Sequence, residues 1–390
     1  MEIKRVYAKV VKDSRKENTI QVILKTTKGL FKTSAPSGKS KGRFEVKSYA
    51  NGLKSDIKII NTLDLSKLNG LLINKFEDLK KLEKEVYKKI GGNSLFALEA
   101  CILKALAKEN KKELWEFLGG KKVPHPVGNS IGGGLHSKGK KGLKPDFQEF
   151  LFVSDCKTFK RCVQINLVAY KMAKKMLKTG VRNDEGAWET GKTNEEVLEI
   201  MNEIQIKIRE KYKEWVEIGL DVAASSFYNG NYNYKNPGKR LNKFNQILYI
   251  RSLIRRYGIF YVEDPLYETD ITGFANLNRE KCFIVGDDLI ATSPERLKKA
   301  MRFKAINAVI VKPNQIGSLL KVKEVVDLCK ARGIKTIISH RSGETTDNTI
   351  ADLGVGFGCD FIKTGIYGPV RESKLRRLIE IEKKLKNQNN

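Results

Sequence analysis

The first part of the chain shows a strand pattern followed by helical patterns. Residues 1 to about 65 are expected to form strands and turns. Apolar residues alternate with polar ones there, as in a half-buried strand: Ile20, Val22 and Leu24. Between residues 79 and 107 the apolar spacing predicts two helices, separated by a break at Gly91-Gly92. These patterns predict an N-terminal α+β domain over residues 1–120.

From about residue 148 the pattern changes to short β-branched runs that each precede an amphipathic helix, which is typical of parallel βα units. The predicted strands are the stretch that ends at Leu220, and then residues 259–262, 283–285, 309–311, 336–339 and 361–362. Repeated βα units over residues 121–390 predict a catalytic βα barrel and therefore an α/β fold.

A charged residue or a histidine follows each predicted strand within one or two positions. These six residues are Asp221, Glu263, Asp287, Lys312, His340 and Lys363, and successive members lie 23 to 42 residues apart, about the length of one βα unit. Each alone could be a helix cap or half of an ion pair. Together they predict a functional site, because the C-terminal strand ends of a βα barrel meet at one rim.

The chemistry of this rim points to metal-assisted proton abstraction. Asp221, Glu263 and Asp287 form an oxygen-donor set that suits Mg²⁺. The two lysines, close to each other and to a metal, are each expected to have a lowered pKa, so that one of them can act as a neutral base. A metal facing a lysine base can remove a proton next to a carboxylate.

Motifs around these residues resemble those of the enolase family over almost the whole chain. In chain order they are residues 34–38 (SAPSG), 148–150 (QEF), 184–186 (DEG), 220–225 (LDVAAS), 263–265 (EDP), 286–289 (GDDL), 312 with 314–317 (K, NQIG), 339–345 (SHRSGET) and 362–365 (IKTG). The resemblance implies an enolase-type TIM-like (βα) barrel with an early antiparallel strand and an N-terminal α+β capping domain. It also implies a Mg²⁺-dependent lyase that interconverts 2-phosphoglycerate and phosphoenolpyruvate in glycolysis and gluconeogenesis.

The same resemblance implies roles for individual residues. Lys312 would take the C2 proton, and Glu185, supported by Glu149, would protonate the departing C3 hydroxyl, which needs a raised pKa at one of these carboxyl groups. The other expected site residues are Asp221, Glu263 and Asp287 for the first Mg²⁺, Ser40 for a second Mg²⁺, Arg341 and Ser342 for the phosphate, Lys363 and His340 for the substrate carboxylate, and His136 and Gln148 for the pocket wall. A homodimer or larger homo-oligomer is expected as well.

The charge of the chain keeps two alternatives open. It has 74 lysines and arginines against 45 acidic residues, a formal charge of +29, which attracts any anion. Most lysines fall on predicted polar helix faces, which favours a solvated surface over nucleic-acid binding. The alternatives are a paralog acting on another phosphorylated or dicarboxylic hydroxy acid, suggested by Lys39, Lys41 and Trp188 at lid and pocket positions, and a basic nucleic-acid-binding protein with a decayed site.

The cysteines and the apolar runs indicate the compartment. The six cysteines include no Cys-x-x-Cys pair and are expected to be free thiols. No apolar run approaches the roughly 20 residues of a membrane span, and the N-terminus does not resemble a secretion signal. The cytoplasm is therefore the expected location.

Overall fold

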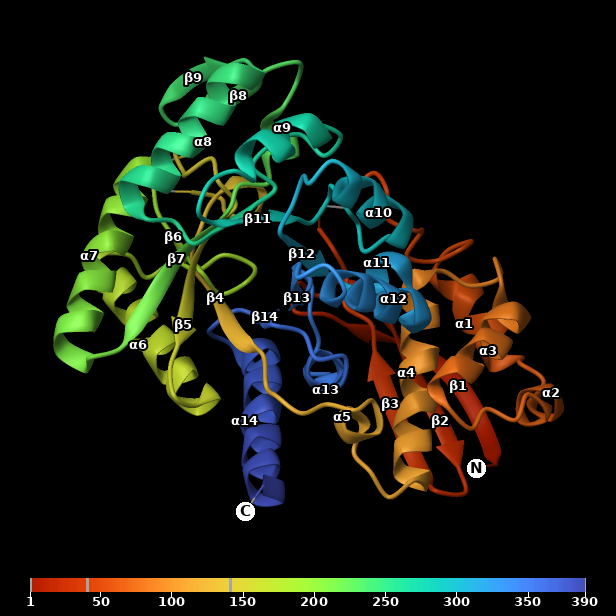
Figure 1. Cartoon of the computed structure of the whole chain (residues 1–390). Coiled ribbons are helices and arrows are strands. Elements are labelled where there is room, and N and C mark those ends of the chain that lie inside the picture. The colour runs from red at the N-terminus through yellow and green to blue at the C-terminus, as the bar shows by residue number, and fades with distance from the viewer. Residues whose placement is uncertain (1, 40–41, 140–141, 390) are drawn as a thin grey trace.

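The structure is a computed structural model of the chain, and it describes residues 2–39, 42–139 and 142–389. Its N-terminal part holds an antiparallel sheet in the order β1-β2-β3, against which helices pack (Figure 1). The strands are β1 (Ile3–Lys12), β2 (Asn18–Thr26) and β3 (Gly29–Ser34), and the helical segments are α1 (Leu53–Asn61), α2 (Leu65–Gly70), η1 (Phe76–Asp78), α3 (Leu79–Val86), α4 (Gly92–Glu109) and α5 (Leu114–Phe117).

The predicted strand and the two predicted helices of this part are present. The alternating residues of β2 are buried, and β2 and β3 pack against α4. Alanines on α4 keep its side chains small, which lets the helix approach the sheet closely. The prediction of strands and turns up to residue 65 is wrong for α1, because Leu53, Ile57 and Ile60 recur there at helical spacing.

Eight of the strands that the structure describes close into a barrel. They are β4 (His125–Gly132), β5 (Glu149–Asp155), β7 (Trp215–Asp221), β10 (Tyr261–Glu263), β11 (Phe283–Gly286), β12 (Ala308–Val311), β13 (Lys335–Ser339) and β14 (Phe361–Lys363), with β6 (Trp188–Glu189) paired to the edge of β4. β5 runs antiparallel to both of its neighbours, and β14 pairs with β4 to close the ring. All six predicted strands are confirmed, as is the antiparallel strand that the family resemblance implied.

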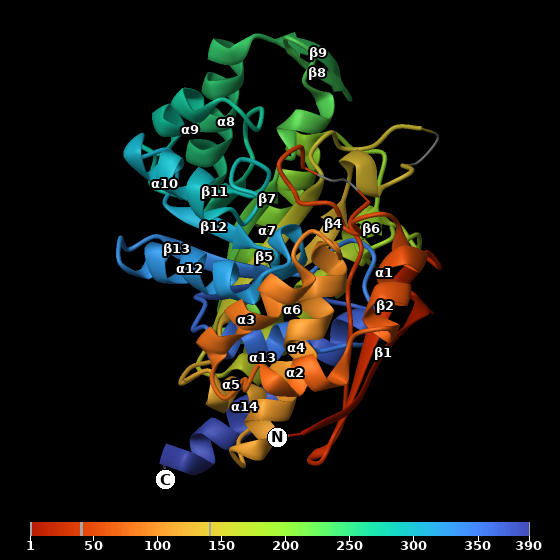
Figure 2. The ribbon, with the colours of Figure 1, turned by 90° about the vertical axis from the view of Figure 1, so that its right-hand side faces the viewer.

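Helices surround this barrel (Figures 1 and 2). They are α6 (Phe159–Leu177), α7 (Asn194–Tyr212), α8 (Lys243–Tyr257), α9 (Ile271–Leu277), α10 (Pro294–Arg302), α11 (Pro313–Ile316), α12 (Leu319–Lys330), α13 (Thr349–Gly356) and α14 (Pro369–Asn389), together with the turns η2 (Gly134–His136) and η3 (Ala224–Phe227) and the hairpin β8 (Tyr232–Lys235) and β9 (Gly238–Leu241). Both chain ends lie at the same end of the molecule in the two views.

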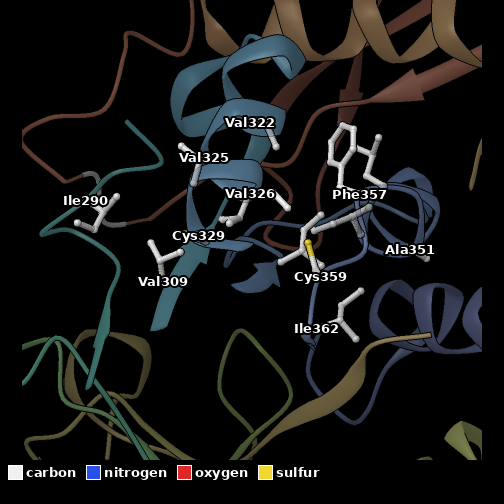
Figure 3. Close-up of a cluster of buried hydrophobic side chains, with 14 of the residues drawn as sticks. Ile290, Val309, Val322, Val325, Val326, Cys329, Ala351, Phe357, Cys359 and Ile362 are labelled. Atoms are coloured by element: carbon white, nitrogen blue, oxygen red, sulfur yellow. The ribbon is translucent and has the colours of Figure 1, made fainter. Parts of the chain in front are cut away.

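The barrel strands contribute to two hydrophobic cores on opposite faces. In β12, Ala308 and Ile310 point into the barrel, whereas Val309 and Val311 belong to the outer core. This follows from the two-residue period of a strand. Figure 3 shows the outer core, where α12 presents Val322, Val325, Val326 and Cys329 toward the region around Val309, Phe357 and Ile362. The apolar face of this amphipathic helix is therefore the face that packs on the barrel.

Two further expectations concern cysteines and membranes. All six cysteines are free in the structure, as predicted. Within the described residues, none of the helices combines the length and the apolar character needed to span a bilayer.

Candidate active site

The charged strand ends meet at one cavity of about 380 Å³, between the barrel rim and the segment that follows β3. Five of the six predicted rim residues line it: Asp221, Asp287, Lys312, His340 and Lys363. The sixth, Glu263, is buried and pairs with Lys363 instead of lining the cavity itself. The other expected residues in the lining are His136, Gln148, Glu149, Glu185, Arg341 and Ser342.

Four other residues were expected at the lid or the pocket, and their outcomes differ. Ser40 and Lys41 lie outside the described residues. The placement of Trp188 at the pocket is wrong, because its large indole is buried in the outer core, stacked on Tyr170 with ring centroids 4.7 Å apart. Lys39 does lie near the cavity, and its Nζ pairs with Asp184 at 3.0 Å.

Lys363 joins three carboxylates at the floor of the cavity. Its Nζ lies 2.8 Å from Glu263 Oε2, 3.0 Å from Glu149 Oε2 and 3.1 Å from Asp221 Oδ2, with all four side chains buried. Burial alone would lower the pKa of Lys363, but these carboxylates outweigh it and raise the pKa well above its ordinary value. Burial and the neighbouring Asp221 raise the pKa of Glu263 to about 8.

Lys312 makes a similar pair with Asp287. It lies between the end of β12 and the start of α11. Its Nζ donates to Asp287 Oδ2, while Gln315 Nε2 donates to Asp287 Oδ1 at 3.1 Å. Burial lowers the pKa of Lys312, but Asp287 outweighs it and the pKa is raised. The nearest charge to each of the two ammonium groups is thus a carboxylate, and this raises both pKa values. The expectation of lowered pKa values applies to lysines beside a bound metal ion, and it stays a prediction.

The carboxylates suit a divalent metal ion by their chemistry. Asp221, Glu263 and Asp287 are buried oxygen donors at adjacent strand ends, and Glu263 Oε1 has no hydrogen-bond partner among the described residues. Hard divalent cations bind such donor sets. The ligand atoms of these three residues do not all lie within 4.8 Å of one another, so they do not form a ready coordination sphere. Two other groups among the described residues meet that distance: His136, Glu149 and Glu185, and Asp264, Asp287 and Asp288. In the structure the ammonium groups of Lys363 and Lys312 provide the positive charge at these carboxylates: Lys363 contacts Asp221 and Glu263, and Lys312 contacts Asp287.

Glu185 lies between two imidazoles on another side of the cavity. Its Oε1 is 3.4 Å from His136 Nδ1, its Oε2 is 3.7 Å from His340 Nε2, and Asn129 donates to Oε2 at 3.3 Å. His136 Nδ1 is also 3.5 Å from Glu149 Oε1. Burial works to raise the pKa of Glu185, but the positive field of His136 and of the Arg371 guanidinium lowers it to about 2. The expected raised pKa is therefore not found at Glu185.

The remaining expected residues are held by groups of the N-terminal part of the chain. Arg341 forms a two-pronged ion pair with Glu45, with Nη1 and Nη2 at 2.9 and 3.0 Å from its carboxylate oxygens. Ser342 Oγ accepts hydrogen bonds from Arg15 Nη1 at 3.0 Å and from the Lys39 backbone N–H at 2.7 Å. Arg15, Glu45 and Arg371 were not predicted from the sequence. They lie in a turn, a loop and the first turn of a helix, where charged residues are common, so nothing in the sequence marks them as site residues.

Two loop contacts bring these N-terminal residues to the rim. Ser37 and Gly343 exchange backbone hydrogen bonds of 2.7 and 2.8 Å, and Ser14 N donates to Glu344 O at 2.7 Å. The segment after β3, red in Figure 2, therefore reaches across to the barrel. The cavity is built from both parts of the chain.

Comparisons with known proteins agree with these features. A family model described as "Enolase, C-terminal TIM barrel domain" matches residues 120–390. Proteins named "Enolase" from Thermoplasma acidophilum and Archaeoglobus fulgidus are each 35% identical to this chain, over 97% and 98% of it and over 98% and 97% of their own lengths. A protein of the same name from Pyrobaculum aerophilum is 38% identical, over 90% of this chain and 87% of its own length.

Proposed function

The chain belongs to the enolase family, and on that premise we propose that it catalyses the reversible, Mg²⁺-dependent dehydration of 2-phosphoglycerate to phosphoenolpyruvate, in glycolysis or gluconeogenesis. The observation that carries this proposal is the placement of a lysine and a pair of glutamates across one cavity. β12, which precedes Lys312, and β5, which begins with Glu149, are four strands apart in the eight-strand ring. Because β5 is antiparallel, its first residue lies at the same rim as the end of β12.

This placement suits an elimination in which a proton and a hydroxyl leave neighbouring carbons. Lys312 is proposed to take the C2 proton, and Glu185, with Glu149 beside it, to deliver a proton to the departing C3 hydroxyl. Both roles require the pKa values to move from those described above: a divalent cation at Asp287 would lower the pKa of Lys312, and the negative charges of the substrate would raise the pKa of Glu185. His136 lies within 3.5 Å of both glutamates, so it orients the acid. Gln148 donates to Asp221 at 3.3 Å and completes that wall of the pocket.

The substrate anions would lie against the remaining cations. Ser342 Oγ already accepts two hydrogen bonds, so its own proton is left to donate, which suits a phosphate oxygen. Arg341 beside it offers a guanidinium for the same group. Lys363 and His340 are proposed to border the substrate carboxylate. Asp221, Glu263 and Asp287 would hold Mg²⁺, which when bound neutralises that carboxylate and eases removal of the proton next to it; Ser40, proposed for a second ion, lies outside the described residues.

A direct assay tests the proposal. Purified protein is mixed with 2-phosphoglycerate while the absorbance of the enol ester is followed, with excess Mg²⁺ or with a chelator. Mg²⁺-dependent formation of phosphoenolpyruvate is the expected result. The same assay on Lys312→Ala, which removes the proposed base, is expected to show a loss of turnover. Lys335→Ala is the matched control, because Lys335 begins the neighbouring strand β13 and pairs with Asp360 away from the cavity.

A folded, metal-binding protein without turnover would overturn the assignment. One observation favours a different substrate in that case. The Lys39–Asp184 pair adds a cation beside the residue that precedes Glu185 in the chain, and the Lys39 backbone N–H donates to Ser342 of the cavity wall. A panel of phosphorylated and dicarboxylic hydroxy acids would then be assayed in the same way. The expected homodimer stays a prediction, which light scattering on the purified protein tests.

A further inference from the structure

Arg371 lies behind the cavity and binds three groups of the loop that follows β13. It is 1% exposed, in the first turn of α14, and does not line the cavity. Its Nη1 lies 2.5 Å from His340 Nδ1 and donates to Arg341 O at 2.9 Å, and its Nη2 donates to Ser342 O at 2.8 Å. One guanidinium therefore fixes an imidazole ring together with the backbone of its two successors.

The contact with the ring settles which nitrogen carries the proton. All the N–H groups of a guanidinium donate hydrogen bonds, and the arginine side chain has no acceptor atom. A proton on His340 Nδ1 would point at the N–H groups of Arg371, so Nδ1 must accept. We infer that Arg371 holds His340 as the neutral tautomer that carries its proton on Nε2.

The surroundings of the ring support this state. Burial, and then the positive charge of Arg371, lower the pKa of His340 well below its ordinary value. Nε2 is the nitrogen nearer the cavity groups, since it lies 3.7 Å from Glu185 Oε2, whereas Nδ1 faces Arg371. His340 thus presents a hydrogen-bond donor, and not a base, on the side of Glu185.

This assignment deepens the proposed function and gives Arg371 a positioning role. If the cavity binds a phosphorylated hydroxy acid, His340 can donate to a substrate oxygen but cannot compete with Lys312 for the proton. The functional consequence rests on the proposed function. The tautomer itself does not, because it follows from contacts in the protein without substrate.

Nitrogen NMR of the histidines tests the inference without any substrate. The chain has only three histidines, so protein labelled with ¹⁵N-histidine gives few ring signals. A His340→Gln variant identifies the signals of His340. The expected spectrum shows an acceptor-type Nδ1 and a protonated Nε2 for this ring. A protonated Nδ1, or a doubly protonated ring, near neutral pH would overturn the inference.

Substitutions then test whether Arg371 is the cause. In Arg371→Met the signals of His340 are expected to shift toward a mixture of tautomers, and in Arg371→Lys, which keeps a donor, to stay closer to the wild-type position. Arg377→Met is the matched control, since Arg377 is on the same helix but pairs with Asp352 and Glu113. Its spectrum is expected to equal that of the wild type. An unchanged His340 signal in a folded Arg371→Met protein would exclude Arg371 as the determinant. Failed turnover of 2-phosphoglycerate would leave this result untouched.

Discussion

Replacing Lys363 by methionine tests whether a divalent ion and the lysine serve the same carboxylates. Lys363→Met keeps most of the length of the side chain but removes the ammonium that contacts Glu149, Asp221 and Glu263 at 2.8–3.1 Å. Removing one partner of a buried ion pair costs about 3–5 kcal/mol, because the remaining charge is left buried without compensation. Without metal, the variant is therefore expected to lose about this much free energy of unfolding.

Mg²⁺ is expected to recover most of this loss. A ligand at a concentration 100 times its Kd stabilises the protein that binds it by about 2.7 kcal/mol. In the variant the ion meets carboxylates with no ammonium among them, whereas in the wild type it competes with Lys363. The stabilisation by Mg²⁺ should therefore be larger in Lys363→Met than in the wild type.

The assay is urea unfolding followed by tryptophan fluorescence, with either a chelator or excess Mg²⁺. Lys374→Met is the matched control, because Lys374 is an equally buried lysine that pairs with Glu344 at 2.8 Å and does not line the cavity. It should be destabilised in both conditions. Equal recovery by Mg²⁺ in the two variants, or no recovery in Lys363→Met, would refute the reasoning.

Three further predictions use other residues and the overall charge. Lys312→Ala should lower turnover of 2-phosphoglycerate by about 10²–10⁴-fold, the usual contribution of a positioned base. Calorimetry should find Mg²⁺ binding no weaker in that variant, since Asp287 loses a competing ammonium; retained turnover would contradict the role of Lys312. Burial opposes ionisation of Asp347, but Lys104 and hydrogen bonds from Thr349 outweigh it and lower its pKa. Ionised Asp347 therefore contributes its full stabilisation above about pH 3.9, the pKa of an aspartate in the unfolded chain, and the stabilisation is lost as the pH falls through the lower pKa of the folded protein. The urea midpoints of wild type and Asp347→Asn should therefore converge at acid pH. Finally, fluorescence anisotropy should detect no binding of single-stranded RNA at moderate salt despite the charge of +29, and tight, steeply salt-dependent binding would instead support the nucleic-acid alternative.

The sequence was sufficient for the barrel and for most of the residues around its mouth. Each parallel strand is a short apolar run, and the polar residue that ends the run must lie at the rim once the strands are parallel. This is why Asp221, Lys312 and Lys363 could be brought together from spacing alone, although they are far apart in the chain. Glu263 ends its strand in the same way but is covered by Lys363, which spacing does not reveal.

The charge states at the site could not be predicted in the same way. A pKa depends on which partner lies nearest, and spacing along the chain does not show that Asp287 contacts Lys312 or that Arg371 lies near Glu185. The contacts from the N-terminal part were missed for a related reason. Arg15 and Glu45 reach the rim through loops, and loops have no periodic pattern from which their position could be inferred.

The closure of the ring by β14 and β4 has a consequence for synthesis on the ribosome. Lys363, at the end of β14, is the last of the cavity residues to be translated, after Glu149, Asp221 and Glu263. A nascent chain that already contains these carboxylates therefore cannot yet pair them with the lysine, and burying them unpaired is unfavourable. The barrel is expected to gain its stable packing only when nearly the whole chain has emerged, and a chain released early, without β14, would lack both the closing strand and the cation at its centre.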